Sequence, residues 1–194
     1  MHLPDSKLLN ALERLSETLK SLPWEQAKRY GVSPIQIQIL LFVAEHPADL
    51  TGVSYLAREF NVTKATVSDA VRVLLKKGYL EKDHSPVDSR RYNLLLTPAG
   101  RELTGRVSDY ARPVRETLDG LDPGALRTTF DTLAQVIYGL NQRGVIPVQR
   151  MCFNCRFYVG DKRRSHRCNL LEIDLKAEDV RMDCPEFSEG EQVG

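Results

Sequence analysis

The sequence predicts a mainly α-helical (α+β) protein with one short two-stranded β-ribbon and a cysteine-rich end. Apolar residues recur at three- and four-residue steps through most of the first 140 residues, which is the spacing of one buried face of an α-helix. Between Tyr79 and Thr97 this spacing gives way to two short runs joined by a polar tip. All four cysteines lie beyond residue 150, so the composition of the chain changes there.

The N-terminal part is predicted to be helical. From Asp5 to about Tyr30 leucines recur at helical steps, and Pro23 should kink or break the helix. Ser33-Pro34 starts the next helix, with a capping hydroxyl followed by proline, and His46-Pro47 ends it. Asp49-Leu50-Thr51 is expected to supply a short third strand beside the ribbon.

A helix-turn-helix is predicted between Val53 and Gly78. The first helix covers residues 53–60, and Asn61-Val62 makes the turn. Thr63 is a good N-cap for a second helix over 63–77, and Gly78 ends it where a left-handed residue is wanted. The residues of the buried face of this second helix are Val67, Ala70, Val71, Leu74 and Leu75.

The ribbon and two later helices follow. The expected strands are 79–83 and 91–96, with a polar tip at 84–90 that contains Pro86. Thr97-Pro98 starts a helix that continues to Leu118 and is kinked by Pro113, and Asp122-Pro123 starts another that ends at 141–144. These helices carry more apolar surface than a small domain needs, which favours an isologous dimer over a monomer.

The outward face of the second helix carries short polar and basic side chains, which fits the major groove of DNA. The free N–H groups of the helix start would attract a phosphate, and Arg90 and Arg91 would reach the backbone or the minor groove. An ordinary solvated helix is the alternative for each residue alone. The ordered combination with Gly78 and the basic tip favours nucleic-acid binding.

The stretch from about Ser33 to Leu103 resembles the MarR family of winged helix-turn-helix regulators. The motifs that carry the resemblance are Leu56-Ala57, Thr63–Ser68, Leu74–Leu80, Asp88-Ser-Arg90 and Leu94–Gly100. The resemblance implies that Arg90 contacts DNA and that Asp88 orients it. It also implies a homodimer on a palindromic operator, and many relatives bind a small-molecule effector. The candidate DNA-binding residues are Thr63, Lys64, Ala65, Thr66, Ser68, Asp69, Arg72, Asp88, Arg90 and Arg91.

Asp69 departs from the family pattern, in which that position more often carries a basic or small residue. Its carboxylate could accept from a cytosine amino group. It could also hold Arg72, one helical turn further on, and we prefer this second interpretation.

The C-terminal segment lies outside the usual family pattern. Cys152 and Cys155 form a Cys-x-x-Cys pair, and Cys168 and Cys184 follow. Four thiolates suit a structural zinc ion, which we favour, or an iron–sulfur cluster, since Cys184-Pro185 resembles the cysteine-proline ending of ferredoxin motifs. Disulfides are disfavoured in a reducing cytosol. His166 could replace one ligand, but we expect it to be an exposed member of the basic run 162–167.

Composition excludes several classes of protein. The 194 residues carry 27 basic and 26 acidic side chains, and no run approaches the ~20 apolar residues of a membrane span. The N-terminus has no signal-peptide pattern, so we expect a cytoplasmic protein without a membrane partner. No enzyme motif is present, so we expect no catalytic activity.

Together these observations predict a DNA-binding transcriptional regulator. We expect a winged helix-turn-helix and dimerisation domain at 1–146, with a DNA-binding core at 53–97 whose wing is 79–97. A metal-binding tail at 147–187 and a disordered end at 188–194 complete the chain. The alternatives are a redox- or metal-sensing regulator, which uses a cluster or a labile zinc site, and a protein-interaction or electron-carrier module that does not bind DNA.

Overall fold

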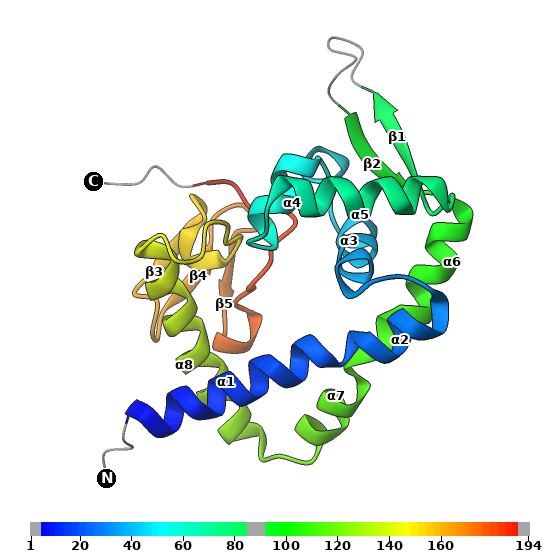
Figure 1. Ribbon diagram of the computed structural model, residues 1–194. Helices are drawn as coiled ribbons and strands as arrows, with labels where there is room; N and C mark the ends of the chain where they lie inside the picture. The colour runs from blue at the N-terminus through cyan, green and yellow to red at the C-terminus, as the bar shows by residue number, and fades with distance from the viewer. Residues whose placement is uncertain (1–4, 85–91, 190–194) are drawn as a thin grey trace. The chain divides into compact units, whose positions relative to one another are not determined.

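A computed structural model describes residues 5–84 and 92–189 and divides them into two compact units (Figure 1). The winged unit contains the described residues up to Ala57 and those from Val62 to Thr117. The C-terminal unit contains Arg58–Asn61 and the described residues from Leu118 onward. The predicted boundary at residue 146 differs from this division and stays a prediction.

The winged unit is mainly helical, as predicted. Its helices are α1 (Asp5–Ser21), α2 (Pro23–Tyr30), α3 (Pro34–Glu45), η1 (Ala48–Leu50), α4 (Val53–Glu59), α5 (Lys64–Lys76), α6 (Pro98–Val107), η2 (Ser108–Ala111) and α7 (Arg112–Asp119), of which α4 and α7 each end in the C-terminal unit. The antiparallel ribbon consists of β1 (Leu80–His84) and β2 (Tyr92–Leu96), with Leu80 opposite Leu96 and His84 opposite Tyr92. The break between α1 and α2 falls next to Pro23, where the sequence predicts it.

The helix starts are fixed by side-chain caps. The Ser33 hydroxyl accepts from the Gln36 amide at 3.4 Å, and the Gln36 side chain accepts from the Ser33 amide at 2.9 Å. Thr97 caps α6 by accepting from Gly100 N at 3.0 Å. Each cap satisfies an amide that the helix itself leaves free, so the Ser-Pro and Thr-Pro starts are confirmed.

The core of the winged unit lies around α3. Ile37, Ile39 and Leu40 are completely buried on this helix, which packs against α5, α6 and β2. Leu74 of α5 and Leu94 of β2 are equally buried. Because α3 is covered on several sides, its apolar residues lie around the helix and are not confined to one face. Helix α5 and the ribbon therefore pack against the same core.

The expected third strand at 49–51 is wrong. The segment is the 3₁₀ turn η1, and the buried side chain of Thr51 replaces a strand pairing. The Thr51 hydroxyl donates to Leu94 O and accepts from Leu94 N, both at 2.9 Å. One hydroxyl therefore satisfies both backbone groups of the middle residue of β2, which removes the need for a neighbouring strand there.

The helix expected up to Leu118 is broken and not only kinked. The chain passes through η2 and starts the separate helix α7 at Arg112, which places Pro113 in the first turn of α7. Proline is tolerated in a first turn because the amide that it lacks has no partner there.

The C-terminal unit combines one long helix with a small sheet. Its elements are α8 (Pro123–Gln142), η3 (Cys152–Asn154), β3 (Tyr158–Gly160), β4 (His166–Cys168), β5 (Ile173–Leu175) and η4 (Ala177–Asp179). The strands form an antiparallel sheet in the order β3-β4-β5 beside α8 (Figure 1). Ala134 of α8 packs with Met151, Phe153 and Val180, so the tail shares a core with this helix.

Arg150 is buried at the start of the tail and forms ion pairs with Asp183 and Glu59, each at 2.7 Å. One expectation about the tail is corrected. The disordered end expected from Ser188 does not begin there. Ser188 O accepts from Arg156 N at 2.9 Å, and Glu189 bridges Cys155. Backbone pairing with the segment after η3 therefore orders the chain up to Glu189.

Candidate functional site

The first turn of α5 is capped and open to solvent. Thr63 Oγ1 accepts from Thr66 N at 3.1 Å, as the sequence predicts, and its hydroxyl lies 2.8 Å from that of Thr66. Thr63, Lys64, Ala65 and Thr66 are all exposed. The start of this helix therefore presents small polar groups and one lysine without obstruction from the winged unit.

The two faces of α5 separate as expected, with one exception on each side. Val67, Ala70, Val71 and Leu74 are buried, whereas Leu75 is only half-buried. On the outward side Asp69 is exposed together with Arg72 and Lys76, while Ser68 is half-buried.

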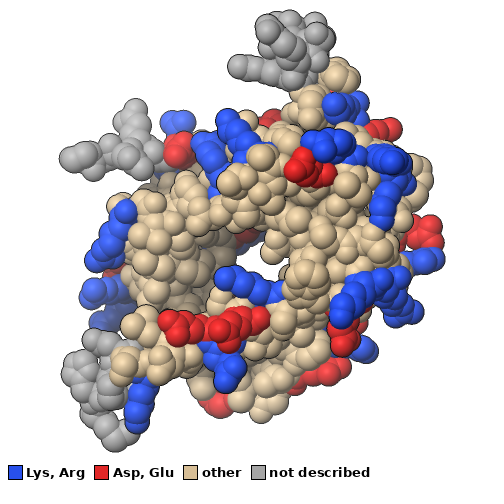
Figure 2. Space-filling model, viewed as in Figure 1, with Lys and Arg blue, Asp and Glu red and all other residues tan. Residues whose placement is uncertain are grey.

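Asp69 forms an ion pair with Arg72, with Oδ1 and Nη2 2.5 Å apart. This contact confirms the interpretation that Asp69 holds Arg72 one turn further along α5. Both side chains are well exposed, so the pair contributes little to stability, but it orients the guanidinium. Figure 2 shows basic and acidic side chains together over the α4–α5 region.

The turn and the end of α5 use left-handed backbone. Asn61 has a φ of 52°, and Gly78 has a φ of 70°. Asparagine tolerates this conformation and glycine accepts it without strain, as the sequence predicts for Gly78. The Thr97 hydroxyl then donates to Gly78 O at 2.6 Å, which ties the end of β2 to the end of α5.

The ribbon extends from this junction. Lys82 places its Nζ 4.0 Å from the centre of the Tyr92 ring, across the two strands. The predicted contact residues Asp88, Arg90 and Arg91 lie outside the described residues. Their roles stay predictions.

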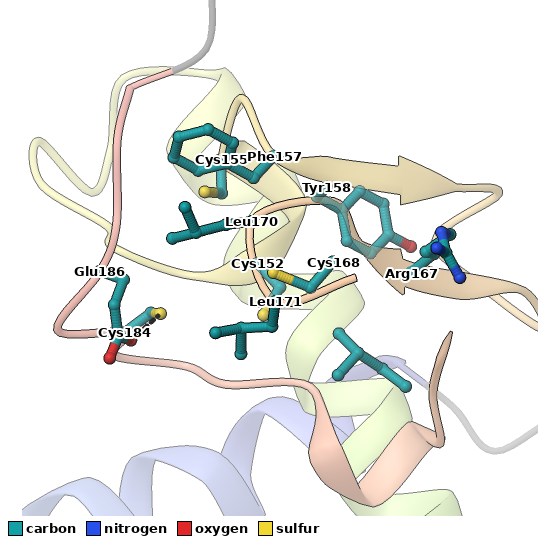
Figure 3. A pocket seen from close by; sticks show the side chains of 11 residues that line it. Cys152, Cys155, Phe157, Tyr158, Arg167, Cys168, Leu170, Leu171, Cys184 and Glu186 are labelled. Carbon is teal, nitrogen blue, oxygen red and sulfur yellow. Dashed lines mark hydrogen bonds between the residues drawn. The ribbon is translucent and has the colours of Figure 1, made fainter. Parts of the chain in front are cut away.

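The C-terminal unit brings all four cysteines to one pocket, which we call the cysteine pocket. Cys152 lies in η3, Cys155 follows it, Cys168 ends β4, and Cys184 follows η4. Their side chains line a pocket of about 350 Å³, including space open to solvent, and Figure 3 shows them spread around it. The remaining lining residues are Phe157, Tyr158, Arg167, Leu170, Leu171, Leu175 and Glu186.

All four cysteines are free thiols, and their surroundings differ. Burial raises the pKa of Cys152 most, the neighbouring Cys155 and Cys168 raise it further, and a hydrogen bond from Arg181 N at 3.3 Å lowers it. Burial also raises the pKa of Cys184. The Arg181 guanidinium lies 3.8 Å from the Cys184 sulfur, so a positive charge faces this side of the pocket.

The spacing of these thiols constrains what they can hold. Among residues 5–84 and 92–189, no group of three or more His, Cys, Asp or Glu lies close enough to hold one metal ion. The four predicted ligands therefore share a pocket without converging on a point.

The expectation that His166 is an exposed member of a basic run is wrong. His166 is buried, its Nδ1 lies 2.7 Å from the Tyr158 hydroxyl, and its ring stacks on Phe153. It faces a second pocket, between α8 and the β3–β4 loop, which is lined also by Lys162 and Arg163. No local pattern in the sequence signals this burial, because the covering residues come from separate segments.

The first part of the chain is similar in sequence to known proteins. The family model that matches is described as MarR family, and it covers residues 30–91, which excludes the cysteines. The chain is 34% identical over 77 residues to a putative transcriptional regulatory protein for the hcr operon of Thauera aromatica. That match covers 40% of this chain and 45% of the Thauera protein, so the chain spans less than half the length of that relative. An uncharacterized protein of Mycobacterium tuberculosis, Rv2011c, is 32% identical over 115 residues, which are 59% of this chain and 78% of that protein.

Solved structures share the fold. A MarR protein from Peptoclostridium difficile is 23% identical with a TM-score of 0.62, and the similarity covers 74% of this chain and 94% of that one. The DNA complex of MepR from S. aureus gives a TM-score of 0.60 at 21% identity, over 72% of this chain and 100% of that one. The described helices include none that is long and apolar enough to cross a membrane.

Proposed function

This chain belongs to the MarR family of transcriptional regulators, and we propose from this premise that it is a homodimer that binds a palindromic operator in duplex DNA. Regulators of this family are not enzymes, in keeping with the lack of catalytic motifs in the sequence. In the proposed complex, residues 63–77 enter the major groove and residues 84–91 contact the backbone or the minor groove.

The observation that carries this proposal is the open, capped start of α5. Its free amides and Lys64 favour a phosphate, and the hydroxyl of Thr66 can bond to a base edge or a phosphate. Arg72, oriented by Asp69, extends the same surface one to two turns further along the helix. MepR of S. aureus has been solved as a complex with DNA, and the likeness of fold supports duplex DNA as the partner of this chain.

Homodimerisation is supported by exposed apolar residues on α1. Leu8, Leu9, Leu15 and Leu19 lie on this helix and are each at least 46% exposed. A second copy of the chain could cover them and hold two α5 helices about 34 Å apart, one DNA turn. A small-molecule effector stays a further expectation of the family resemblance.

We also propose a metal centre in the tail, held by Cys152, Cys155, Cys168 and Cys184. A small sheet of three-residue strands buries little apolar area, so a metal would add much of its folding free energy. A zinc ion and an iron–sulfur cluster are the two occupants that four thiolates admit.

Salt dependence of DNA binding tests the main proposal. The full chain should bind bulk duplex DNA, and its affinity should fall steeply as salt rises, because bound phosphates release counterions. Lys64→Ala should lower the salt slope by about one for each phosphate that the lysine neutralises, in both protomers of a dimer. Lys176→Ala, which removes the same charge from the tail, is the matched control and should leave the slope unchanged.

Two results would contradict this proposal. Weak binding that does not depend on salt would favour the protein-interaction alternative. A salt slope that Lys64→Ala and Lys176→Ala lower equally would show that α5 is not the contact surface.

A further inference from the structure

We infer that the cysteine pocket is built for an iron–sulfur cluster and not for a single zinc ion. The inference rests on the metal centre proposed above, and it names the occupant of that site. It depends on how the four thiols are placed, on the pocket walls and on where His166 lies.

The thiols are placed apart around a common space. A zinc ion holds each thiolate sulfur at about 2.3 Å, so its four sulfurs lie roughly 3.8 Å from one another. No three potential ligands in the described part of the chain come together for one ion, although all four cysteines line the same pocket. In a [4Fe–4S] cluster each thiolate binds a different iron atom, and sulfide ions fill the space between the irons. Ligands of a cluster therefore stand apart around a common centre. In Figure 3 the four cysteines come to one pocket from different segments of the chain.

The walls of the pocket are largely apolar. Apolar side chains line the pocket between the cysteines: Phe157, Leu170, Leu171 and Leu175. Such a lining limits the access of water and helps to set the potential of a cluster. Leu170 and Leu171 remain 44% and 45% exposed. The exposure of two leucines beside four thiols is explained if their side chains cover a bulky inorganic group.

The donor groups that line the pocket include four cysteine thiols and the Glu186 carboxylate, and its lining contains no imidazole. His166, the alternative ligand in the sequence, lines the second pocket and is held by Tyr158. Four thiolates without histidine are the usual ligand set of [2Fe–2S] and [4Fe–4S] clusters. Arg181 donates its backbone N–H to the Cys152 sulfur, a hydrogen bond of the kind that tunes cluster potential. Both candidate centres with four thiolates carry negative charge, so the guanidinium beside Cys184 suits either one.

Metal and sulfide analysis of the full chain tests this inference. Protein purified without oxygen from iron-supplied cells should absorb in the visible and contain iron and acid-labile sulfide. Because zinc can displace iron during expression, metal-free protein with reduced thiols should also be offered ferrous and ferric iron, sulfide and zinc together. Ferric iron is included because the resting cluster contains ferric as well as ferrous ions. Assembly of a cluster under this competition is the expected result.

Variants identify the ligands. Cys155→Ser and Cys168→Ser should each lose most of the iron and sulfide, while Glu178→Gln should keep both. Glu178 belongs to the same unit but does not line the pocket, and it pairs with Arg127 of α8 at 3.2 Å, so it is a control outside the cluster site. Circular dichroism and the salt slope of DNA binding verify that each variant keeps its winged unit.

The proposals of a cluster, of a metal centre and of a DNA-binding regulator can be refuted separately. One zinc per chain, without sulfide, in both preparations would overturn the cluster and keep the metal centre. Binding of neither metal would overturn both. DNA binding is measured separately, so either failure leaves the proposed regulator to its own test. Full cluster content in both serine variants would show that the cluster is held elsewhere.

Discussion

At the scale of single residues, Gly100 shows how closely the ribbon approaches α6. A Cβ added at Gly100 would lie 1.9 Å from the backbone oxygen of Tyr79, whereas a Cβ at Gly105 in the same helix would meet nothing within 4 Å. The backbone of Tyr79 belongs to the junction between α5 and β1 and cannot swing aside as a flexible side chain can. A side chain at Gly100 therefore forces the helix and the ribbon apart.

We expect Gly100→Ala to destabilise the winged unit by about 1–3 kcal/mol, the usual cost of overpacking. Gly105→Ala should instead stabilise it by up to about 1 kcal/mol, because alanine is the better helix former. Urea denaturation of both variants measures the difference. Equal midpoints for the two variants would mean that the approach of α6 to Tyr79 is looser than the structure shows.

Residues whose role depends on near neighbours were predicted well. Thr63 caps α5 through an amide three residues away, and Asp69 meets Arg72 across one turn, so a short window of sequence contains both partners. His166 was mispredicted because its partners Tyr158 and Phe153 lie on other segments. The burial of Arg150 could not be predicted for the same reason, because its carboxylate partners lie far along the chain.

At the scale of elements, the helices and the ribbon followed from spacing, caps and proline. The sheet β3-β4-β5 did not, because strands of three residues are too short to show an alternating pattern. Pairing places Tyr158 opposite Cys168 and Cys168 opposite Ile173, which no local pattern specifies. The sequence was thus enough to single out the four cysteines, but it did not predict the pocket that they share.

The loop between β3 and β4 is organised by one carboxylate. Asp161 Oδ1 accepts from the amides of Arg163, Arg164 and Ser165 at 2.9, 2.7 and 2.9 Å. These hydrogen bonds hold the pKa of Asp161 well below its ordinary value of 3.8. Since the folded pKa is lowered, the stabilisation is present above the ordinary pKa and is lost only as pH falls through the lowered one.

We therefore expect the loop to keep its structure at about pH 4, where ordinary aspartates are half protonated. A nuclear magnetic resonance titration of the Asp161 carboxyl and of the three loop amides measures this. Asp161→Asn should weaken the loop at neutral pH, because a neutral carboxamide is a poorer acceptor for three amides. A carboxyl that titrates near its ordinary pKa in the folded protein would contradict the network of hydrogen bonds.

At the scale of the whole molecule, the exposed leucines of α1 are the surface that the proposed homodimer would cover. Leu15 is 57% exposed, and Leu8, Leu9 and Leu19 repeat beside it at helical spacing. The described part of the chain leaves this stripe open to solvent, and a stripe on a helix of 17 residues is long enough for a helix-to-helix interface. In an isologous dimer each leucine acts twice, so one substitution changes the interface at two places.

Leu15→Glu should therefore weaken the dimer strongly. Loss of two buried leucine side chains costs roughly 3–6 kcal/mol, which corresponds to a rise of about a hundredfold or more in the dissociation constant. Glutamate is a good helix former, so α1 itself should persist. Analytical ultracentrifugation measures the dimer, and the salt slope of DNA binding should fall by about half as each monomer reaches a single half-site.

Val145→Glu is the control for this substitution. Val145 is 58% exposed, similar to Leu15, but it lies in the C-terminal unit on the segment after α8. It should leave both the dimer and the salt slope unchanged. If Leu15→Glu also left the dimer intact, the α1 stripe would not be the interface. The pairing of two recognition helices on a palindrome would then have to depend on α7 or α8, whose exposed Leu118, Leu133 and Val136 are the next apolar surfaces to substitute.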